Sequence, residues 1–526
     1  MKILISDNLS KQGVEILQKA GFTVEVKTKM AKEDLLREIK RYEGLIVRSG
    51  TKVTAEVLGA ADKLRIIGRA GSGLDNVDLV TATKRGIVVM NTPGGNTVTT
   101  AEHTLAMIFA LARKIPQANA SMKGGKWEKE RFMGTELYNK NLGIVGMGQI
   151  GSHLAKLAQG VLMNVIAFDP YLAEDQARKL GVEMMTLQDL FRRADIITVH
   201  TPLTPETKNI INTETIATMK DGVKIINCAR GGIINEKDLV EALKTGKVAG
   251  AAFDVFEEEP IKVDHPLLSL ENFICTPHIG ASTTEAQENV AIGIAEQVVD
   301  YLTKGIARGA VNVPSVPADL LPRLQPYITL AEKLGSLQSQ LYEGGIEGVT
   351  IEYKGEVAGV NVAPLTIAAL KGLLTPILEE TVNYVNAPVI ARERGIEVKE
   401  VKSSDAGDFT SLISLQVEAG KKTSRIAGAL YSRRDPRIVQ LDSFRVEIVP
   451  DGHMLFILNN DRPGVIGDVG QVLGKHAINI ARMQCSREEK GGEALLILGV
   501  DAPLNTETLR AINTVKNILS VKVVHL

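Results

Sequence analysis

The sequence is poor in the residues that disulfide frameworks, metal sites and membrane spans require. Its 526 residues include three widely separated cysteines, Cys228, Cys275 and Cys485, and form no C-x-x-C pair, so neither a disulfide framework nor a metal site is expected. No run of about 18 apolar residues marks a membrane span, and the apolar part of MKILISDNLS is too short for a signal peptide. We therefore expect a cytoplasmic protein without metal or membrane contact.

The chain also lacks an excess of either charge. Its 61 Lys and Arg against 62 Asp and Glu give a formal net charge of −1, which gives no reason to expect nucleic acid as a partner. Any anion must therefore be bound by a local cluster of cations. With 44% hydrophobic residues, the chain can bury several cores, and roughly 100–200 residues per domain predicts three or four domains.

A glycine-rich segment, NLGIVGMGQIG, places Gly146, Gly148 and Gly151 between an expected strand and an expected helix. The triple alone is weak evidence in a chain with 48 glycines, so its context decides. The apolar run LGIV before it predicts a buried strand, and IGSHLAKLA after it has helical spacing. A second strand, VIAF, then ends in Asp169, close to the spacing expected for the acid that binds the ribose of a dinucleotide.

Each residue type in this unit has a mechanical role in dinucleotide binding. Gly146 permits a tight turn, Gly148 lets the backbone approach the pyrophosphate, and Gly151 lets helix and strand pack closely. The helix N-terminus offers free N–H groups to the anion. Asp169 would accept hydrogen bonds from ribose hydroxyls and repel a 2′-phosphate, which favours NAD over NADP.

The order of expected elements defines the fold class and the domains. The class is α/β, with two Rossmann-like doubly wound parallel-sheet domains followed by an α+β intervening domain and a ferredoxin-like domain of β-α-β-β-α-β pattern. Strand-like and helix-like runs alternate through the first half, and four prolines near 314–326 indicate a linker at about 311–322. The expected domains are 1–94 with 283–310, 95–282, 315–447 and 452–526.

Bound NAD implies hydride transfer, which also requires a base for the hydroxyl proton and a cation for a carboxylate or carbonyl. Histidine is the likeliest base by its ordinary pKa near neutrality. Of the eight histidines, His200 and His278 each end an expected strand of the second domain. By placement alone both are candidates, and a structural role is the alternative for each.

Two charged residues favour His278. Arg230 follows the expected strand VKIIN, and Glu259 lies in the loop after AGAAFDV, at the rim where His278 also falls. A glutamate beside a histidine raises the basicity of the imidazole, and Arg230 could pair bidentately with an α-carboxylate. A solvated loop charge is the alternative for Arg230 and Glu259 taken singly.

Four motifs, GMGQIG, NCARGG, DVFEEEP and CTPHIGAST, in this order and spacing, resemble the D-2-hydroxyacid dehydrogenase family. The resemblance implies that His278 is the acid/base, that Glu259 modulates it and that Arg230 anchors the substrate, and it returns His200 to a structural role. The segments VRSGT, GRAGSGLDNVD and WEKERFMGTEL, with the length and domain order, extend it over essentially the whole chain to the long-form phosphoglycerate dehydrogenases.

This resemblance implies NAD-dependent oxidation of 3-phospho-D-glycerate to 3-phosphohydroxypyruvate, the first step of L-serine biosynthesis. Besides the glycines and Asp169, the implied cofactor contacts are Ser72, Gln149, Ile150, Thr201, Cys228 and Asp254. The implied substrate contacts are Arg48, Ser49, Arg69, Asn96 and Lys129. Arg48, Ser49 and Arg69 also follow expected strand ends of the first domain, where open α/β sheets bind ligands.

One departure from the family concerns the phosphate. Some relatives carry a second arginine where this chain has Gly50, so we assign the phosphate to Arg69. Trp127 and Lys129 are expected to reach across a homodimer interface. A homotetramer is the alternative, because the amino-acid sites of the regulatory module that the last domain resembles commonly form between paired copies.

The last domain resembles the regulatory ACT domain through NNDRPGVIGDVG and INI. The resemblance implies L-serine as an effector held by Asn459, Asp461 and Asn479; a Pro-Gly turn that caps a helix is the alternative. The domain before it resembles the intervening domain of the long-form enzymes, which is associated with oligomer contacts and anion binding. An anion patch, or otherwise a solvated basic face, is expected from Lys421, Lys422, Arg425, Arg433 and Arg434.

Two other functions stay open from the sequence. A dehydrogenase for another D-2-hydroxyacid would use the same three catalytic residues, although the arginines of the first domain and the terminal module argue against it. A dinucleotide-sensing binding protein is the alternative of another class. The two additional C-terminal domains and the lack of a disordered interaction tail argue against that alternative.

Overall fold

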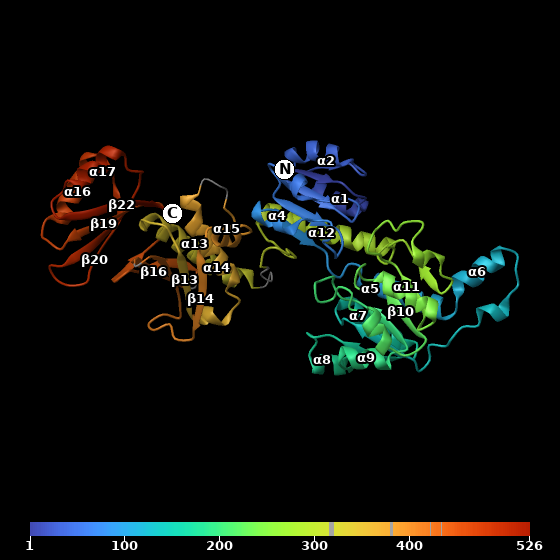
Figure 1. The fold of residues 1–526 in the computed structure, drawn as a ribbon. Coiled ribbons are helices and arrows are strands. Elements are labelled where there is room, and N and C mark those ends of the chain that lie inside the picture. Colours follow the sequence, from blue (N-terminus) through green and yellow to red (C-terminus); the bar gives the residue numbers. More distant parts are fainter. Residues whose placement is uncertain (315–319, 379–381, 421, 433) are drawn as a thin grey trace.

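The structure is a computed structural model that describes residues 1–314, 320–378, 382–420, 422–432 and 434–526. Residues 315–319 of the expected linker therefore lie outside the described residues, as do Lys421 and Arg433 of the expected anion patch. The described residues form four sheets in succession, with the first two and the last two at opposite ends of the molecule (Figure 1). In the described ranges, no helix is long and apolar enough to cross a membrane.

The first sheet is built from short apolar runs, because parallel strands are buried on both faces. Its order is β2-β1-β3-β4-β5, parallel throughout. The order reverses between β1 and β3, so Asp7 and Arg48, which follow these strands, lie at the switch point where such sheets bind ligands. The elements are β1 (Lys2–Ile5), α1 (Lys11–Lys19), β2 (Thr23–Val26), α2 (Lys32–Glu38), η1 (Ile39–Arg41), β3 (Gly44–Val47), α3 (Ala55–Gly59), β4 (Ile66–Arg69), α4 (Leu79–Lys84) and β5 (Val88–Asn91).

The second sheet has the order β12-β11-β10-β9-β6-β7-β8 and is also parallel. Its order reverses between β6 and β9, which places the glycine loop after β6 at the switch point. This confirms the predicted α/β class with two doubly wound sheets. The elements are β6 (Asn141–Val145), α7 (Gln149–Gly160), β7 (Asn164–Phe168), α8 (Glu174–Lys179), β8 (Glu183–Met184), α9 (Leu187–Arg193), β9 (Ile196–Val199), α10 (Thr213–Thr218), β10 (Val223–Asn227), α11 (Glu236–Thr245), β11 (Val248–Phe253), η3 (Pro266–Ser269) and β12 (Phe273–Cys275).

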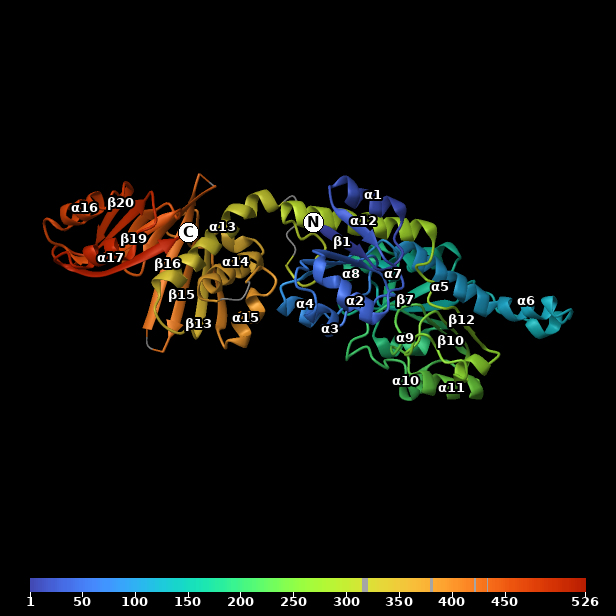
Figure 2. The ribbon, with the colours of Figure 1, turned by 90° about the horizontal axis from the view of Figure 1, so that it is seen from above.

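Two long helices connect these sheets. α5 (Thr97–Ala112) leads from β5 to the second sheet, and α12 (Thr284–Lys304) returns to pack against α1 and β4 of the first. Ile294 and Val298 of α12 are fully buried in the core of the first sheet. Between α5 and β6 an arm with α6 (Ile115–Lys123) and η2 (Lys129–Phe132) extends away from the second sheet (Figure 2). Trp127 on this arm is 81% exposed.

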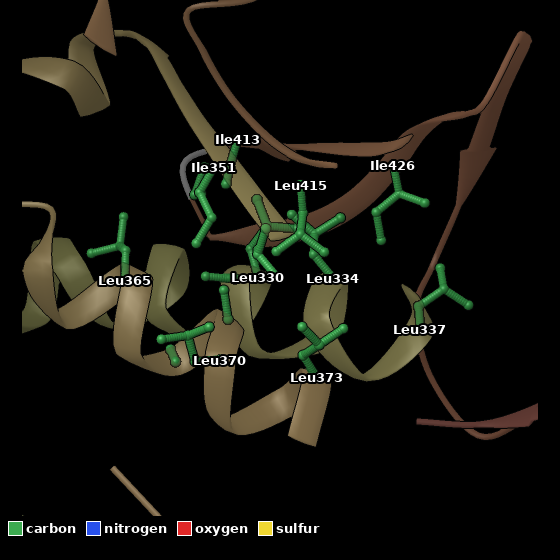
Figure 3. Close-up of a cluster of buried hydrophobic side chains, with 14 of the residues drawn as sticks. Leu330, Leu334, Leu337, Ile351, Leu365, Leu370, Leu373, Ile413, Leu415 and Ile426 are labelled. Carbon is green, nitrogen blue, oxygen red and sulfur yellow. The ribbon is translucent and has the colours of Figure 1, made fainter. Parts of the chain in front are cut away.

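The third sheet is mixed, with the order β14-β13-β15-β16-β17-β18. Its inner face packs on α13 and α14 through leucines and isoleucines (Figure 3). The predicted linker extended to Pro322, but α13 already begins at Leu321, because proline fits the first turn of a helix. The elements are α13 (Leu321–Leu341), β13 (Gly348–Gly355), η4 (Glu356–Gly359), α14 (Ala363–Leu374), η5 (Thr375–Ile377), α15 (Ala387–Glu393), β14 (Glu397–Ser403), β15 (Ser411–Ala419), β16 (Lys422–Tyr431), β17 (Asp435–Leu441) and β18 (Phe444–Ile448).

The fourth sheet is antiparallel with the order β20-β21-β19-β22, which is the predicted ferredoxin-like pattern. Apolar side chains of one sheet face, including Met454, Phe456 and Ile497, belong to the same hydrophobic cluster as α13. The last two units therefore share one core, although the domain boundaries themselves remain predictions. The elements are β19 (His453–Asn460), α16 (Val465–Lys475), β20 (Ile480–Arg487), β21 (Glu493–Val500), α17 (Thr506–Asn513) and β22 (Ile518–His525).

Candidate active site

The glycine loop forms a narrow turn in front of an open helix end. Gly146 has a φ of 99°, and a Cβ there would lie 2.7 Å from the carbonyl oxygen of His200. A Cβ on Gly151 would lie 2.1 Å from the carbonyl oxygen of Gly146. At Gly148, which precedes α7, a Cβ would meet no atom within 4 Å. The loop thus leaves space at the N-terminus of α7, where an anion is stabilised.

Two polar groups beside this space fit a dinucleotide. Asp169 accepts hydrogen bonds from the backbone N–H of Met147, at 2.7 Å, and of Tyr171, at 2.8 Å, and each oxygen keeps a lone pair for a ribose hydroxyl. The buried hydroxyl of Thr201 has no hydrogen-bond partner among the described residues. It lies beside Gly146, and such a group needs a partner. These observations fit a pyrophosphate at α7 and a ribose at Asp169.

The other expected cofactor residues lie at the junction between the two sheets or behind the loop. The Ser72 hydroxyl donates to the side-chain oxygen of Asn96 at 2.7 Å, and the Thr97 hydroxyl donates to the side-chain oxygen of Gln149 at 3.1 Å. Ile150 is the second residue of α7. Burial raises the pKa of the Cys228 thiol to about 12, so this cysteine stays protonated near neutral pH.

His278 and Glu259 form a direct pair. Nδ1 of His278 lies 2.7 Å from Oε2 of Glu259. This hydrogen bond raises the pKa of His278 above its ordinary value, although burial and the positive charge of Arg230 act in the opposite direction. Burial alone would raise the pKa of Glu259, but the hydrogen bonds from His278 and from the Phe256 backbone lower it overall. The imidazole is therefore a stronger base than a free histidine.

The loop that carries His278 is held from behind by a buried carboxylate. His278 has a φ of 54°, a left-handed conformation that costs a non-glycine residue about 1–3 kcal/mol. Asp254, only 1% exposed, accepts from the backbone N–H of Ile279 at 2.8 Å and of Gly280 at 2.7 Å. Burial would raise the pKa of Asp254, but its hydrogen bonds, first among them one from His103, lower it overall.

Sequence reasoning missed two supports of this carboxylate. The Thr276 hydroxyl donates to Asp254 at 2.5 Å, and Nε2 of His103 lies 3.4 Å from it. His103 lies on α5, and no local pattern in the sequence indicates that this helix faces the loop of His278. The carboxylate of Asp254 thus holds the loop of His278, and its expected contact with the cofactor stays a prediction.

His200 occupies a different environment from His278. Its Nε2 lies 3.0 Å from the Thr198 hydroxyl, and burial lowers its pKa to about 4. A neutral, buried imidazole behind the glycine loop fits the structural role that the family resemblance assigns to it.

Three arginines lie where the carboxyl edges of the two sheets meet, a region that the ion pair of Arg230 with Asp75 bridges and that is called the cleft below. Arg69, at the end of β4, has a buried Nε without a hydrogen-bond partner among the described residues. Burial first, and then the charges of Arg230 and Arg48, lower the pKa of Arg69 to about 10. The backbone N–H of Arg48 donates to Asp7 at 2.6 Å, and Ser49 next to it is exposed. Clustered guanidinium groups of this kind are typical of sites for carboxylate and phosphate.

Lys129, predicted to contact substrate, is not brought to this cleft. It lies on the arm, where the neighbouring Arg131 pairs at 2.6 Å with Glu271. Glu271 precedes β12, whereas the cleft lies at the opposite, carboxyl ends of the strands. Lys129 therefore does not reach the cleft of its own chain, because the arm turns away from the rim.

The three expected serine-binding residues are not brought together either. β19 and β20 both run antiparallel to β21, with Asn460 opposite Glu493 and Ile480 opposite Val500. Asp461, which follows β19, and Asn479, which precedes β20, therefore lie at opposite ends of the sheet. Asp461 accepts from Arg487 at 2.7 Å and Asn479 donates to Asp501 at 2.7 Å. Asn459 lies at the same end of the sheet as Asp461, and its buried side-chain oxygen has no hydrogen-bond partner among the described residues.

The expected anion patch is incomplete in the described part of the chain. Arg425 donates to Glu352 and to the Ser414 hydroxyl, which compensates its charge. Lys422 and Arg434 are exposed, so the alternative of a solvated basic face describes these two residues better.

A dinucleotide loop, a histidine–glutamate pair and converging arginines in a cleft between two doubly wound sheets define an NAD-dependent dehydrogenase of 2-hydroxyacids. Residues 105–280 match the D-isomer specific 2-hydroxyacid dehydrogenase NAD-binding domain. Residues 323–442 match the D-3-phosphoglycerate dehydrogenase intervening domain, and 453–517 match the ACT domain.

Full-length relatives extend these matches over the whole chain. A D-3-phosphoglycerate dehydrogenase of Bacillus subtilis is 45% identical over 100% of this chain and 99% of the relative. One from Synechocystis is 45% identical over 98% of this chain and 93% of the relative. The chain belongs to the D-3-phosphoglycerate dehydrogenase family.

Solved structures match about 60% of the chain. The NAD+-bound 3-phosphoglycerate dehydrogenase of Entamoeba histolytica is 32% identical, with a TM-score of 0.51 over 60% of this chain and 99% of that chain. The TT0316 protein of Thermus thermophilus is 35% identical, with a TM-score of 0.56 over 59% of this chain and 100% of that chain.

The substitution Glu259→Gln is expected to lower the pKa of His278. A neutral amide no longer stabilises the imidazolium, while burial continues to destabilise it, so the pKa should fall to or below the ordinary value of about 6.5. NMR titration of ring-labelled histidine in the full chain measures this directly. The matched control is Glu258→Gln, because Glu258 is exposed and pairs with Lys262. An unchanged His278 titration in Glu259→Gln would contradict the assignment.

Proposed function

We propose that this chain catalyses the NAD-dependent oxidation of 3-phospho-D-glycerate at C2 to 3-phosphohydroxypyruvate, the first step of L-serine biosynthesis. The observation that carries the proposal is a paired His278 and Glu259 in one cleft with Arg48, Arg69 and Arg230. A base and separate cations for a carboxylate and a phosphate are what this substrate requires. The name that the full-length relatives share supports the same substrate.

The roles follow from the chemistry of each group. Arg230 pairs with the carboxylate of the substrate, which places the C2 hydroxyl toward the imidazole of His278. His278 removes the hydroxyl proton, and Glu259 stabilises the imidazolium that results. NAD, when bound, supplies the acceptor for the hydride from C2. In the reverse direction the same imidazolium returns its proton to the oxygen, so one residue serves as base and as acid.

The phosphate is assigned to Arg69, with Arg48 beside it. Nε of Arg69 is buried and has no hydrogen-bond partner among the described residues. Burial and neighbouring cations also lower the pKa of Arg69 to about 10. Both conditions are unfavourable for a charged guanidinium that has no anion bound to it. A dianionic phosphate would relieve both conditions. Gly50 supplies no additional cation, and a Cβ there would lie 2.7 Å from Asp7.

A second candidate is the oxidation or reduction of another D-2-hydroxyacid, because the solved neighbours include a D-lactate dehydrogenase of Escherichia coli, 29% identical with a TM-score of 0.54. That reaction needs a cation that binds the carboxylate of the substrate and a base, but it needs no phosphate site. The uncompensated Arg69 argues against it. A dinucleotide-sensing protein would bind NAD without turning over any hydroxyacid.

Arg69→Ala is expected to raise the KM for 3-phospho-D-glycerate about tenfold to a hundredfold, because a charge-assisted contact to the phosphate is lost. The effect on D-glycerate, which lacks the phosphate, should be much smaller. Initial rates of NADH formation give the KM for each of the two substrates. Arg65→Ala is the control, since Arg65 lies at the opposite end of the same strand.

Equal losses on the two substrates would contradict the phosphate assignment. Absence of NADH formation from the phosphorylated substrate by the unmodified protein would contradict the proposed function itself.

We further infer a serine-regulated oligomer. Asp461 and Asn479 lie at opposite ends of one sheet, so a site that uses both needs a second copy of the terminal domain. The exposed arm with Trp127 supports a homodimer, and paired terminal domains would extend it to a homotetramer. A cytoplasmic location is also proposed, and the three free cysteines agree with a reducing compartment.

Asp461→Ala and Asn479→Ala are each expected to weaken serine binding at least tenfold, because each removes a charged or amide group from every shared site. Equilibrium dialysis of the intact protein with labelled serine measures this. Asp451→Ala, an exposed acid before β19, serves as the control. The proposal would be overturned if the unmodified protein bound no serine under conditions where it binds NAD.

A further inference from the structure

An ion pair joins the two sides of the cleft at the arginine assigned to the substrate carboxylate. Nε of Arg230, from the second sheet, donates to Oδ2 of Asp75, from the first, at 3.0 Å. Nη1 of Arg230 donates to the carbonyl oxygen of Ala229 at 2.7 Å. Asp75 follows β4 in the loop AGSGLD and is 155 residues distant in sequence. No sequence pattern around Asp75 indicates a role for it.

The same loop is shaped to accept the guanidinium group. A Cβ on Gly73 would lie 2.1 Å from Nη2 of Arg230, so the guanidinium rests against the backbone at that glycine. The side chain of Arg230 is 32% exposed and that of Asp75 is 70% exposed. The contact is therefore accessible to solvent and easily exchanged, unlike a buried ion pair.

Asp7, which follows β1, is used differently. Asp7 accepts from the backbone N–H groups of Arg48 and Thr51, at 2.6 and 3.1 Å, and so fixes a loop. Asp75, by contrast, pairs directly with a guanidinium.

We propose that Asp75 is a placeholder for the carboxylate of the substrate. It holds and partly neutralises Arg230 before substrate binds, and it releases Nε when the substrate carboxylate arrives. This inference rests on the proposed function, because it needs Arg230 as the carboxylate site. A guanidinium binds a carboxylate bidentately through two parallel N–H groups. Nε donates to Asp75, and one N–H of Nη1 donates to Ala229. A carboxylate can therefore bind the edge formed by Nε and Nη2 only after it has replaced Asp75 at Nε.

The exchange has a consequence for affinity. Every ligand that binds Arg230 through Nε must replace the contact with Asp75, so Asp75 lowers the apparent affinity for carboxylates at this site. Asp75 is thus a positioning residue that acts through Arg230 and sets the substrate concentration at which the cleft fills.

Asp75→Asn tests the proposal, because it keeps the size of the side chain and removes the charge that competes. Isothermal titration with 3-phospho-D-glycerate, without NAD so that no turnover occurs, should give a Kd about threefold to fivefold lower than that of the unmodified protein, the range expected for an exposed ion pair. In initial-rate measurements the fall in KM should exceed any change in kcat.

Two controls separate local competition from a general change in charge. Asp75→Glu keeps the charge and should retain an affinity close to that of the unmodified protein. Asp62→Asn removes an exposed charge of the first sheet and should have no effect.

A double-mutant cycle tests whether Asp75 acts through Arg230. In the background of Arg230→Ala, Asp75→Asn should no longer tighten binding; an effect of the same size in both backgrounds would overturn the proposal. An unchanged or higher Kd in Asp75→Asn would also overturn it. Failure of the proposed function is a separate observation, since it appears as absence of NADH formation by the unmodified protein.

Discussion

The groups of this site depend on one constraint: the strands of a parallel sheet all end at the same edge. In the first sheet that edge carries Arg48 and Arg69, and in the second it carries the glycine loop, Arg230 and His278. Since both sheets are doubly wound, each also has a switch point where the helices separate and a ligand can enter. α5 and α12 connect the sheets, and the two edges meet in one cleft.

Within that cleft, burial disfavours the charged form of each ionisable group, and hydrogen bonds or opposite charges favour it. The balance between the two sets the pKa of each group. Asp254 is buried yet ionisable because its oxygens accept several hydrogen bonds, and it thereby holds the strained backbone at His278. Nε of Arg69 is buried without a hydrogen-bond partner among the described residues. The first arrangement stabilises a catalytic geometry before any ligand binds, and the second leaves a positive charge that an anionic substrate would compensate.

The parts of the site that depend on periodicity and strand order could be predicted from the sequence. Apolar runs indicated the two parallel sheets, and the residues after them placed Arg230 and His278 at one rim. Contacts between segments that are distant in sequence could not be predicted, because no local pattern encodes them: the pair of Asp75 and Arg230 is one, and the contact of His103 with Asp254 is another.

Three further features of the structure are not displayed by the sequence, each for a specific physical reason. β14, with the charged sequence EVKEVKS, lacks the apolar alternation of a typical strand. The separation of Asp461 and Asn479 follows from the strand order of the last sheet, which a one-dimensional reading of the motifs does not give. The hydrophobic core shared by the last two units depends on which face of a sheet is covered by α13, and that is decided only in three dimensions.

A crystal structure of the full chain with NADH and 3-phospho-D-glycerate would test the central claim most directly, because this pair occupies the site without turnover. The account predicts the C2 hydroxyl within hydrogen-bond distance of Nε2 of His278, the carboxylate on Arg230 and the phosphate on Arg69. A substrate bound with its hydroxyl on another group, or with its phosphate away from Arg69, would contradict it.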